Sequence, residues 1–274
     1  MRILIKRIFP GMYKRWAAHR NRKADLGAYK RWLKHHPGCT FKDFYVETIQ
    51  GHLFGEQGPH STLGPQPVWE NKGDAILHRL IGLGLRPSDI VVDYGCGTLR
   101  EGKHLIRYLD AGHYIGLDID ERVLDAGRRL VEPALIAEKR PQLAVINRKV
   151  VSEVAATKPA WIVSSYVLSQ MPPQELEEYF NNLLQFMEGG GKAILQVRLA
   201  WRTMQYARTG WYHSRGRMAK RLAKRGLEVL AAGTRPLTSK RYKVRGVEMR
   251  LIVAKRTGCG DAIGSAGVGG VMKA

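Results

Sequence analysis

From Asn71 onward the chain alternates short apolar runs with amphipathic stretches, and this alternation restricts the fold more than any other feature. The apolar runs have the length of buried strands, and the stretches between them repeat apolar residues every three or four positions, as a half-buried helix does. Strands and helices that alternate at this spacing form a parallel sheet with helices on both faces. The predicted strands are Ile90–Asp93, His113–Asp118, Leu143–Ile146, Ala160–Ser165, Ala193–Val197, Gly226–Leu230 and Val247–Ala254.

The last two predicted strands have no helical pattern between them, which predicts an antiparallel edge. We therefore predict an α/β fold with a doubly wound, seven-stranded, mostly parallel sheet whose last strand is antiparallel. Two helix starts are also predicted. Thr98 and Glu101 have the spacing of a capping box, and Ser214 is placed to cap a basic helix that runs to Arg225.

Three segments are predicted along the 274 residues. Residues 1–70 form a basic extension of helix and loop, residues 71–256 form the alternating domain, and residues 257–274 form a loose, glycine-rich tail. In the extension, His52, His60 and Trp69 belong to a region that we expect to act as a lid. With 44% hydrophobic and 25% charged residues, the composition excludes a wholly disordered chain.

The composition also bears on where the protein is found. Three widely spaced cysteines cannot form a disulfide framework, and no uninterrupted apolar run reaches the ~20 residues of a membrane helix. We therefore expect a cytoplasmic protein. Between Ile5 and Trp16, apolar residues at helical spacing alternate with Lys and Arg, so residues 1–34 are a candidate for peripheral contact with the inner membrane surface. Pro10-Gly11 interrupts this stripe and favours a short lid or docking helix instead.

Positive charge is concentrated in two flanks of the chain. The formal net charge is +21. Residues 1–40 hold 11 basic residues against one acidic residue, and residues 198–256 hold 17 against two, whereas residues 41–197 have a net charge of −4. This distribution indicates a common fold whose substrate-binding side is shaped for anions. A generally basic surface would give the same distribution of charge.

The turn after the first predicted strand is the best candidate for a ligand site. Ligands of open α/β sheets bind at the carboxyl ends of the strands, and Gly95 and Gly97 allow the backbone to approach a ligand closely. A dinucleotide fingerprint requires a third glycine, where this chain has Arg100. Asp93 would also repel a pyrophosphate. These features favour a ligand that lacks phosphate and carries positive charge.

At this point the sequence resembles the class I S-adenosylmethionine (SAM)-dependent methyltransferases, whose cofactor carries an ammonium and a sulfonium but no phosphate. The similarity covers roughly residues 71–256. It rests on four segments: Val91–Thr98 (VVDYGCGT), Tyr114–Asp118 (YIGLD), Trp161–Met171 (WIVSSYVLSQM) and Gly189–Leu195 (GGGKAIL). The most specific part is the combination of Asp93 and the glycine turn with a second acid, Asp118, 25 residues after Asp93. Each of these features alone is weak evidence for the family.

The resemblance implies a role for particular residues. Asp93 and the turn Gly95, Cys96, Gly97 would face the methionine part of SAM, and Asp118, followed by Ile119, would bind the ribose hydroxyls. Asn147 stands where the family often has an acid near adenine. Ser165 and Tyr166 would lie near the transferred methyl group. Local alternatives remain open for several of them: an Asx turn for Asp93, a helix cap for Asp118, and strand packing for Ser165 and Tyr166.

Methyl transfer requires a base only where the acceptor must lose a proton. His213 is the first candidate for this role and Tyr166 the second, although a buried or exposed histidine without catalytic function is an alternative for His213. Cys96 lies within the glycine turn and is expected to pack there rather than act as a nucleophile. No His, Cys or carboxylate cluster has the spacing of metal ligands, so no metal is predicted.

Three functions fit the sequence. The first is O-methylation of a sugar, a lipid-linked glycan or another small anionic metabolite, since the turn after the fourth strand resembles the small-molecule branch of the family. The second is RNA methylation, because the positive charge attracts phosphate, although no RNA-binding module is recognisable. The third is SAM binding without catalysis, against which the intact glycine turn and its two acids argue.

Overall fold

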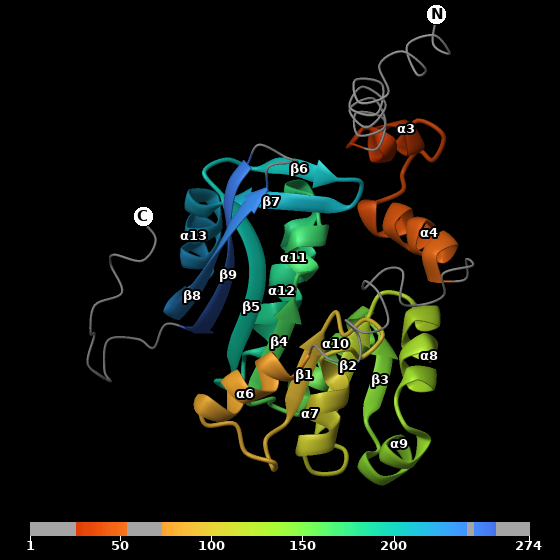
Figure 1. Ribbon diagram of the computed structural model, residues 1–274, viewed down its shortest axis with the longest axis vertical. Helices are drawn as coiled ribbons and strands as arrows, with labels where there is room; N and C mark the ends of the chain where they lie inside the picture. Colours follow the sequence, from red (N-terminus) through yellow and green to blue (C-terminus); the bar gives the residue numbers. More distant parts are fainter. Residues whose placement is uncertain (1–25, 54–72, 240–243, 256–274) are drawn as a thin grey trace, which may run out of the picture.

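The computed structural model describes residues 26–53, 73–239 and 244–255, and Figure 1 shows how their elements are arranged. In this part of the chain, nine strands form one sheet. The strands are β1 (Val91–Tyr94), β2 (Tyr114–Asp118), β3 (Gln142–Val145), β4 (Trp161–Ser165), β5 (Lys192–Ala200), β6 (Met204–Ala207), β7 (Gly210–Ser214), β8 (Leu227–Ser239) and β9 (Val244–Lys255).

The first five strands form the parallel part of the sheet, in the order β3-β2-β1-β4-β5. The chain builds outward from β1 to β3, then returns to the other side of β1 and continues through β4 to β5. Strand order therefore reverses between β1 and β4. In such a sheet, a crevice forms at the carboxyl ends of the two strands that flank the reversal.

Beyond β5 the sheet divides into two branches. Seven residues of β5, from Ala193 to Leu199, pair antiparallel with β9, and β9 pairs antiparallel with β8. The last strand is thus antiparallel to both of its neighbours, as predicted. The end of β5 also pairs with β7, through Leu199 and Ala200 only, and β7 forms an antiparallel hairpin with β6. This hairpin is not among the strands predicted from the sequence.

Helices cover both faces of the sheet (Figure 1). The face of α6, α7 and α8 and the face of α10, α12 and α13 each bury a separate apolar cluster against the strands. Five further elements are the short helices α9 and α11, the 3-10 turn η2, and the N-terminal pair α3 and α4. The bounds are α3 (Ala28–Leu33), α4 (Phe41–Leu53), α6 (Asp74–Gly82), α7 (Gly102–Tyr108), α8 (Glu121–Leu130), α9 (Pro133–Lys139), α10 (Arg148–Ala156), α11 (Val167–Gln170), η2 (Pro173–Glu175), α12 (Leu176–Phe186) and α13 (Arg215–Lys224).

Alternation of side chains along β5 places polar groups at one end of the sheet. Leu195 and Val197 belong to the apolar cluster on the side of α10, α12 and α13, and Ile194 belongs to the cluster on the opposite side. Because successive side chains of a strand point to opposite faces, Gln196 and Arg198 share the face of Ile194. They lie beyond the end of the apolar core on that face.

The predicted helix starts have different outcomes. The side chain of Ser214 accepts a hydrogen bond from the Arg217 backbone N–H at the start of α13, as predicted. The prediction of a capping box formed by Thr98 and Glu101 is wrong, because α7 begins at Gly102 and the Glu101 side chain makes no capping hydrogen bond there. The carboxylate of Glu101 instead accepts a hydrogen bond from Ser165 at the end of β4.

Candidate active site

The glycine turn after β1 is held against the end of β2. The backbone N–H groups of Gly95 and Cys96 both donate to the Leu117 carbonyl, at 2.8 and 3.0 Å. Gly95 and Gly97 have φ values of +87° and +57°, a region that residues with a Cβ atom rarely adopt. A Cβ atom on Gly95 would lie 2.1 Å from Val167 Cγ2, whereas one on Gly97 would meet nothing within 4 Å. The turn is therefore packed on the Gly95 side and open at Gly97.

Asp93 lies beneath this turn, buried at the end of β1. Its carboxylate accepts a hydrogen bond of 2.8 Å from the Tyr114 hydroxyl. Burial raises the pKa of Asp93 from 3.8 to about 7, and the nearby negative charges of Glu101 and Asp118 add to this rise, whereas the Tyr114 hydrogen bond opposes it. A buried carboxylate of this kind is stabilised in its ionised form by a cation placed beside it.

Asp118 lies at the end of the neighbouring strand β2, and its two oxygens are held by backbone groups. Oδ2 accepts from Gly97 N–H and Oδ1 from Ile119 N–H, each at 2.8 Å. Burial raises the pKa of Asp118 to about 6, and the two backbone hydrogen bonds oppose this rise. A carboxylate has about four acceptor positions, so each oxygen of Asp118 keeps capacity for another donor.

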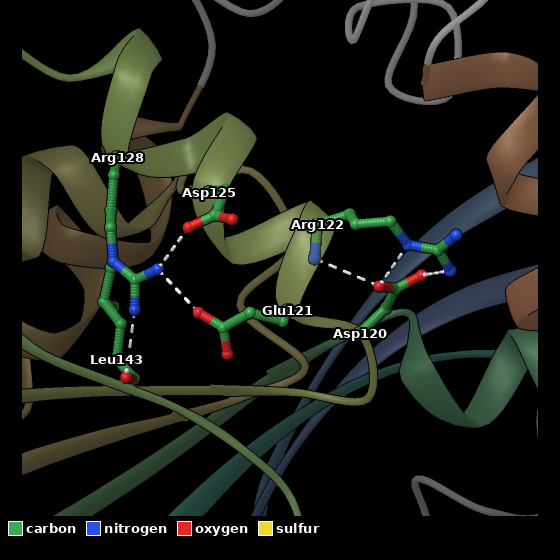
Figure 2. A network of polar contacts seen from close by, with 6 residues as sticks. All are labelled: Asp120, Glu121, Arg122, Asp125, Arg128 and Leu143. Carbon is green, nitrogen blue, oxygen red and sulfur yellow. Dashed lines mark hydrogen bonds and ion pairs between the residues drawn. The ribbon is translucent and has the colours of Figure 1, made fainter.

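The helix cap that was an alternative role for Asp118 is made by Asp120 instead. The Asp120 side chain accepts from the Arg122 backbone N–H at the start of α8 and also pairs with the Arg122 guanidinium (Figure 2). Further along α8, Arg128 bonds to Asp125 and to the Leu143 carbonyl of β3. These contacts secure α8 directly after β2, and Asp118 is left to face the glycine turn.

Asp93 and Asp118 line one cavity of about 1090 Å³, which opens at the carboxyl ends of β1, β2 and β4. Gly95, Cys96, Gly97, Ile119, Ser165 and Tyr166 line it as well. Eight of the ten residues predicted to bind the cofactor or to act in catalysis therefore line the same cavity. Glu101 also lines the cavity, and sequence analysis assigned it only to a helix cap. The position of Glu101, about one helical turn after the glycine loop, was the signal in the sequence that could have placed it in the cavity lining.

One wall of the cavity is formed by residues of β5 and the hairpin that the sequence analysis did not select. Gln196, Arg198 and Tyr206 line the cavity beside Tyr166. Gln196 Nε2 donates to the Tyr166 hydroxyl at 2.7 Å, and the Arg198 guanidinium lies 5.1 Å from the centre of the Tyr166 ring. Tyr166 has a φ of +66°, which is unusual for a residue with a bulky side chain. Two polar residues spaced by two at the end of an apolar strand were the signal that could have identified this wall.

Of the two N-terminal helices, α4 contributes residues to the cavity wall. Figure 1 shows α3 and α4 beyond the ends of the strands and beside the β6–β7 hairpin. The Phe41 ring packs edge-on against Trp211 of β7, with ring centres 5.0 Å apart, and Phe41 and Tyr45 line the cavity. Glu175 ties both helices to the domain, because it accepts hydrogen bonds from the Tyr29 hydroxyl and the Phe41 backbone N–H.

Two solved structures with a similar architecture are methyltransferases. Phosphoethanolamine N-methyltransferase 1 of Haemonchus contortus, solved with phosphoethanolamine and S-adenosylhomocysteine, is 12% identical and covers 85% of this chain and 53% of its own, with a TM-score of 0.57. A SAM-dependent methyltransferase of Leishmania major is 14% identical over 81% of this chain and 89% of its own, with a TM-score of 0.55. The protein has the class I SAM-dependent methyltransferase fold.

Sequence comparison is less informative about the branch of this fold. No family model matches the chain. The 18S rRNA (guanine(1575)-N(7))-methyltransferase of Saccharomyces cerevisiae is 23% identical over 147 residues, which are 53% of this chain and 53% of that protein. The chain therefore spans about half of the length of this curated relative.

Within this methyltransferase fold, His213 does not reach the cavity. It is 3% exposed, its Nε2 lies 2.6 Å from the Leu168 carbonyl, and burial lowers its pKa below 6.5. The prediction of His213 as a general base is therefore corrected. The reason is that residues 210–214 form β7, and β7 turns this side chain toward Leu168 of α11.

Asn147 is also absent from the cavity lining. It caps α10: its amide oxygen accepts from Val150 N–H at 3.0 Å, and its Nδ2 donates to the Val145 carbonyl at 3.2 Å. The preceding residue, Ile146, lines the cavity instead. Cys96 is buried in the turn and burial raises the pKa of its thiol, which suits the packing role expected for it.

Several predictions concern residues outside the described part of the chain. These are the roles of His60 and Trp69 in a lid, the helix between Ile5 and Trp16, and the tail 257–274. His52 falls at the end of α4, where only the backbone is described. Among the helices of residues 26–53 and 73–239, none has the length and apolar character needed to cross a bilayer.

Proposed function

We propose that the protein is a methyltransferase that uses SAM and acts on a hydroxyl group of a sugar, a lipid-linked glycan or another small anionic metabolite. One observation carries the proposal. The carboxylates of Asp93 and Asp118 lie in one cavity on either side of a glycine turn, at the point where strand order reverses. A cationic nucleoside without phosphate suits this pair of acids.

The residues present fit SAM in three respects. The two acids suit a cofactor with an ammonium and a sulfonium and would repel a pyrophosphate. The turn is open at Gly97, where a Cβ atom would meet nothing within 4 Å. The cavity volume of about 1090 Å³ lies at the upper end for small-molecule sites, so it holds space for an acceptor beside a nucleoside.

Each of these residues has a role in binding the cofactor. Asp118 would accept the two ribose hydroxyls with the positions that Gly97 N–H and Ile119 N–H leave open. Asp93 would face the charged methionine part, and Ser165 would lie near it through its hydrogen bond to Glu101. SAM supplies an electrophilic methyl group on its sulfonium sulfur.

The rest of the cavity would hold and align the acceptor. Tyr166, Gln196 and Arg198 line it from the ends of β4 and β5, and Phe41 and Tyr45 line it from α4. Aromatic side chains of α4 exclude water from the site, which helps an in-line displacement by a hydroxyl oxygen. With His213 outside the cavity, Tyr166 remains the candidate among the predicted residues to receive the acceptor proton, a role that requires its ionised form.

Calorimetry with S-adenosylhomocysteine tests the cofactor site. Asp118→Ala removes both acceptors for the ribose, and we expect the Kd to rise by about tenfold to about hundredfold, as losing hydrogen bonds to a charged group does. Asp125→Asn, on α8 and outside the cavity lining, is the matched control and should bind as the wild type does. Circular dichroism checks that both variants fold. Undiminished binding by Asp118→Ala would contradict the assignment of this residue.

Transfer of radiolabelled methyl from SAM into a fractionated cell extract tests the activity itself. We expect label in small molecules or glycans rather than in RNA or protein. Cofactor binding without label in any fraction would favour a protein that binds SAM without catalysis.

RNA is the second candidate acceptor. Its support is the similarity to the yeast rRNA methyltransferase and the net charge of +21. Peripheral contact of residues 1–34 with an anionic membrane surface stays a prediction, because residues 1–25 lie outside the described chain.

A further inference from the structure

Arg198 is a charged residue of the cavity wall that also contains Tyr166, Gln196 and Tyr206. It lies on β5, lines the cavity, and is half-buried. In the described part of the chain, no ion pair joins its guanidinium to a carboxylate. Its contacts there are two tyrosine rings, with centres 5.1 Å away for Tyr166 and 5.2 Å away for Tyr206, and a hydrogen bond from its Nη1 to the Tyr206 hydroxyl.

The carboxylates around the cavity are held by other donors. Asp43 accepts from the backbone and hydroxyl of Thr40, and Glu177 pairs with Arg221 and Arg225 of α13. Glu175 accepts from the N-terminal helices, and Glu101 accepts from Ser165 and lies near Arg100. These four acids contribute to the negative charge of the cavity wall together with Asp93 and Asp118, but within the described residues no hydrogen bond or ion pair joins any of the four to Arg198.

The residues around Arg198 hold its side chain in place, and they leave some N–H donors of its guanidinium available for a ligand. The Arg198 backbone N–H donates to Ser169 Oγ at 2.8 Å, which fixes the end of β5 against α11. The Tyr166 ring beside the guanidinium is in turn held by Gln196. A guanidinium has five N–H donors in a planar fork, and aromatic rings contact its faces without occupying its edges. Such a fork matches the two oxygens of a carboxylate or a phosphate.

We propose that Arg198 binds the anionic group of a small acceptor, either a carboxylate or a phosphate monoester, and thereby determines which molecules are methylated. The inference rests on the proposed function, because the cavity must also hold SAM. Arg198 is then a residue of acceptor specificity, and cofactor binding does not depend on it.

The strand pairing offers a competing partner for the same charge. In the antiparallel register of β5 and β9, Glu248 is the residue opposite Arg198. If Glu248 neutralised Arg198, the pair would be structural. In that case Arg198→Gln and Glu248→Gln would lower Tm by equal amounts, the double variant would lower it no further, and methyl transfer would be unchanged. This set of results would overturn the proposal.

The experiment compares the full-length wild type with Arg198→Gln, Arg198→Lys and the control Arg202→Gln. Arg202 stacks on the exposed Trp201 and does not line the cavity. Each protein is titrated with S-adenosylhomocysteine and then incubated with radiolabelled SAM and the small-molecule fraction of a cell extract. Labelled products are separated on an anion exchanger. Phosphatase treatment then distinguishes the two anions, because a product with a phosphate monoester no longer binds the exchanger after treatment, whereas a carboxylate product still binds.

We expect all four proteins to bind S-adenosylhomocysteine within about twofold of each other. The wild type and Arg202→Gln should label an anionic product, Arg198→Gln should lose at least about tenfold of this label, and Arg198→Lys should keep part of it because the charge remains without the fork. Label in neutral or cationic products, or equal label from wild type and Arg198→Gln, would overturn the inference alone. Absence of cofactor binding by the wild type would contradict the proposed function instead.

Discussion

Gly95 is restricted by its backbone conformation and by its neighbour. Its φ of +87° is unfavourable for a residue with a Cβ atom, and that atom would lie 2.1 Å from Val167 Cγ2. We therefore expect Gly95→Ala to lower the free energy of unfolding by about 2–4 kcal/mol, from backbone strain and overpacking together. Urea unfolding followed by circular dichroism measures the loss. Adding Val167→Ala should restore part of it, since it removes the contact but not the strain.

Gly97 provides the control for this prediction. A Cβ atom there has open space, so Gly97→Ala should cost only the backbone strain of about 1 kcal/mol. The cofactor, however, would approach the turn from this open side. Gly97→Ala should therefore weaken cofactor binding more than it weakens the fold. Equal losses of stability in the two alanine variants would contradict the packing described for Gly95.

The raised pKa of Asp93 predicts a pH dependence of stability. In the unfolded chain this carboxyl ionises near its usual value of 3.8, whereas the folded protein keeps its proton until about pH 7. The stabilising contribution is complete below pH 4 and is lost as the pH rises toward 7, with a slope of up to about 1.4 kcal/mol per pH unit. Urea unfolding between pH 4 and 7 without cofactor measures it.

Asp93→Asn is the matched variant for this titration. The difference in free energy of unfolding between wild type and variant isolates the contribution of Asp93 from those of other groups. We expect that difference to change steadily from pH 4 to about pH 7 and to be constant above it. A difference that does not vary with pH would show that Asp93 ionises normally in the folded protein.

Among the elements, the docking of α3 and α4 on the domain depends on Glu175. Glu175→Ala leaves the Tyr29 hydroxyl and the Phe41 N–H without their acceptor, which costs about 1–3 kcal/mol. We expect faster amide hydrogen exchange across residues 28–47 and little change in the strands of the sheet. Glu178, nearby on α12, is exposed and provides the control, since Glu178→Ala should leave amide exchange in α3 and α4 unchanged. Equal protection of α3 and α4 in both variants would contradict this anchoring role.

For the whole molecule, the net charge of +21 predicts electrostatic attraction to RNA. In gel shifts with an unstructured RNA, we expect binding that weakens by more than about tenfold between about 50 and about 200 mM salt, because released counterions drive it. On the proposed function, no methyl label enters this RNA. Methylation of the RNA with a preferred sequence or structure would favour the second candidate acceptor.

The prediction of the fold succeeded where the patterns are local. Strand and helix periodicities are set by residues a few positions apart, and they determined the doubly wound sheet and its antiparallel last strand. The same holds for the cofactor side of the site. Asp93 and Asp118 each end a predicted strand, and parallel strands meet at one edge, so the sequence was sufficient to bring these two acids together.

The acceptor side was decided only by the tertiary structure. Arg198, Glu175 and Phe41 come from distant parts of the chain. The polar end of β5 marks Arg198, but nothing local to Glu175 or Phe41 indicates that they share a cavity with it. His213 shows the same dependence, because β7 pairs with only two residues of β5 and thereby determines which way the histidine points. Local sequence determines which segments form strands and helices, but the packing of segments far apart in the chain determines which side chains face one another.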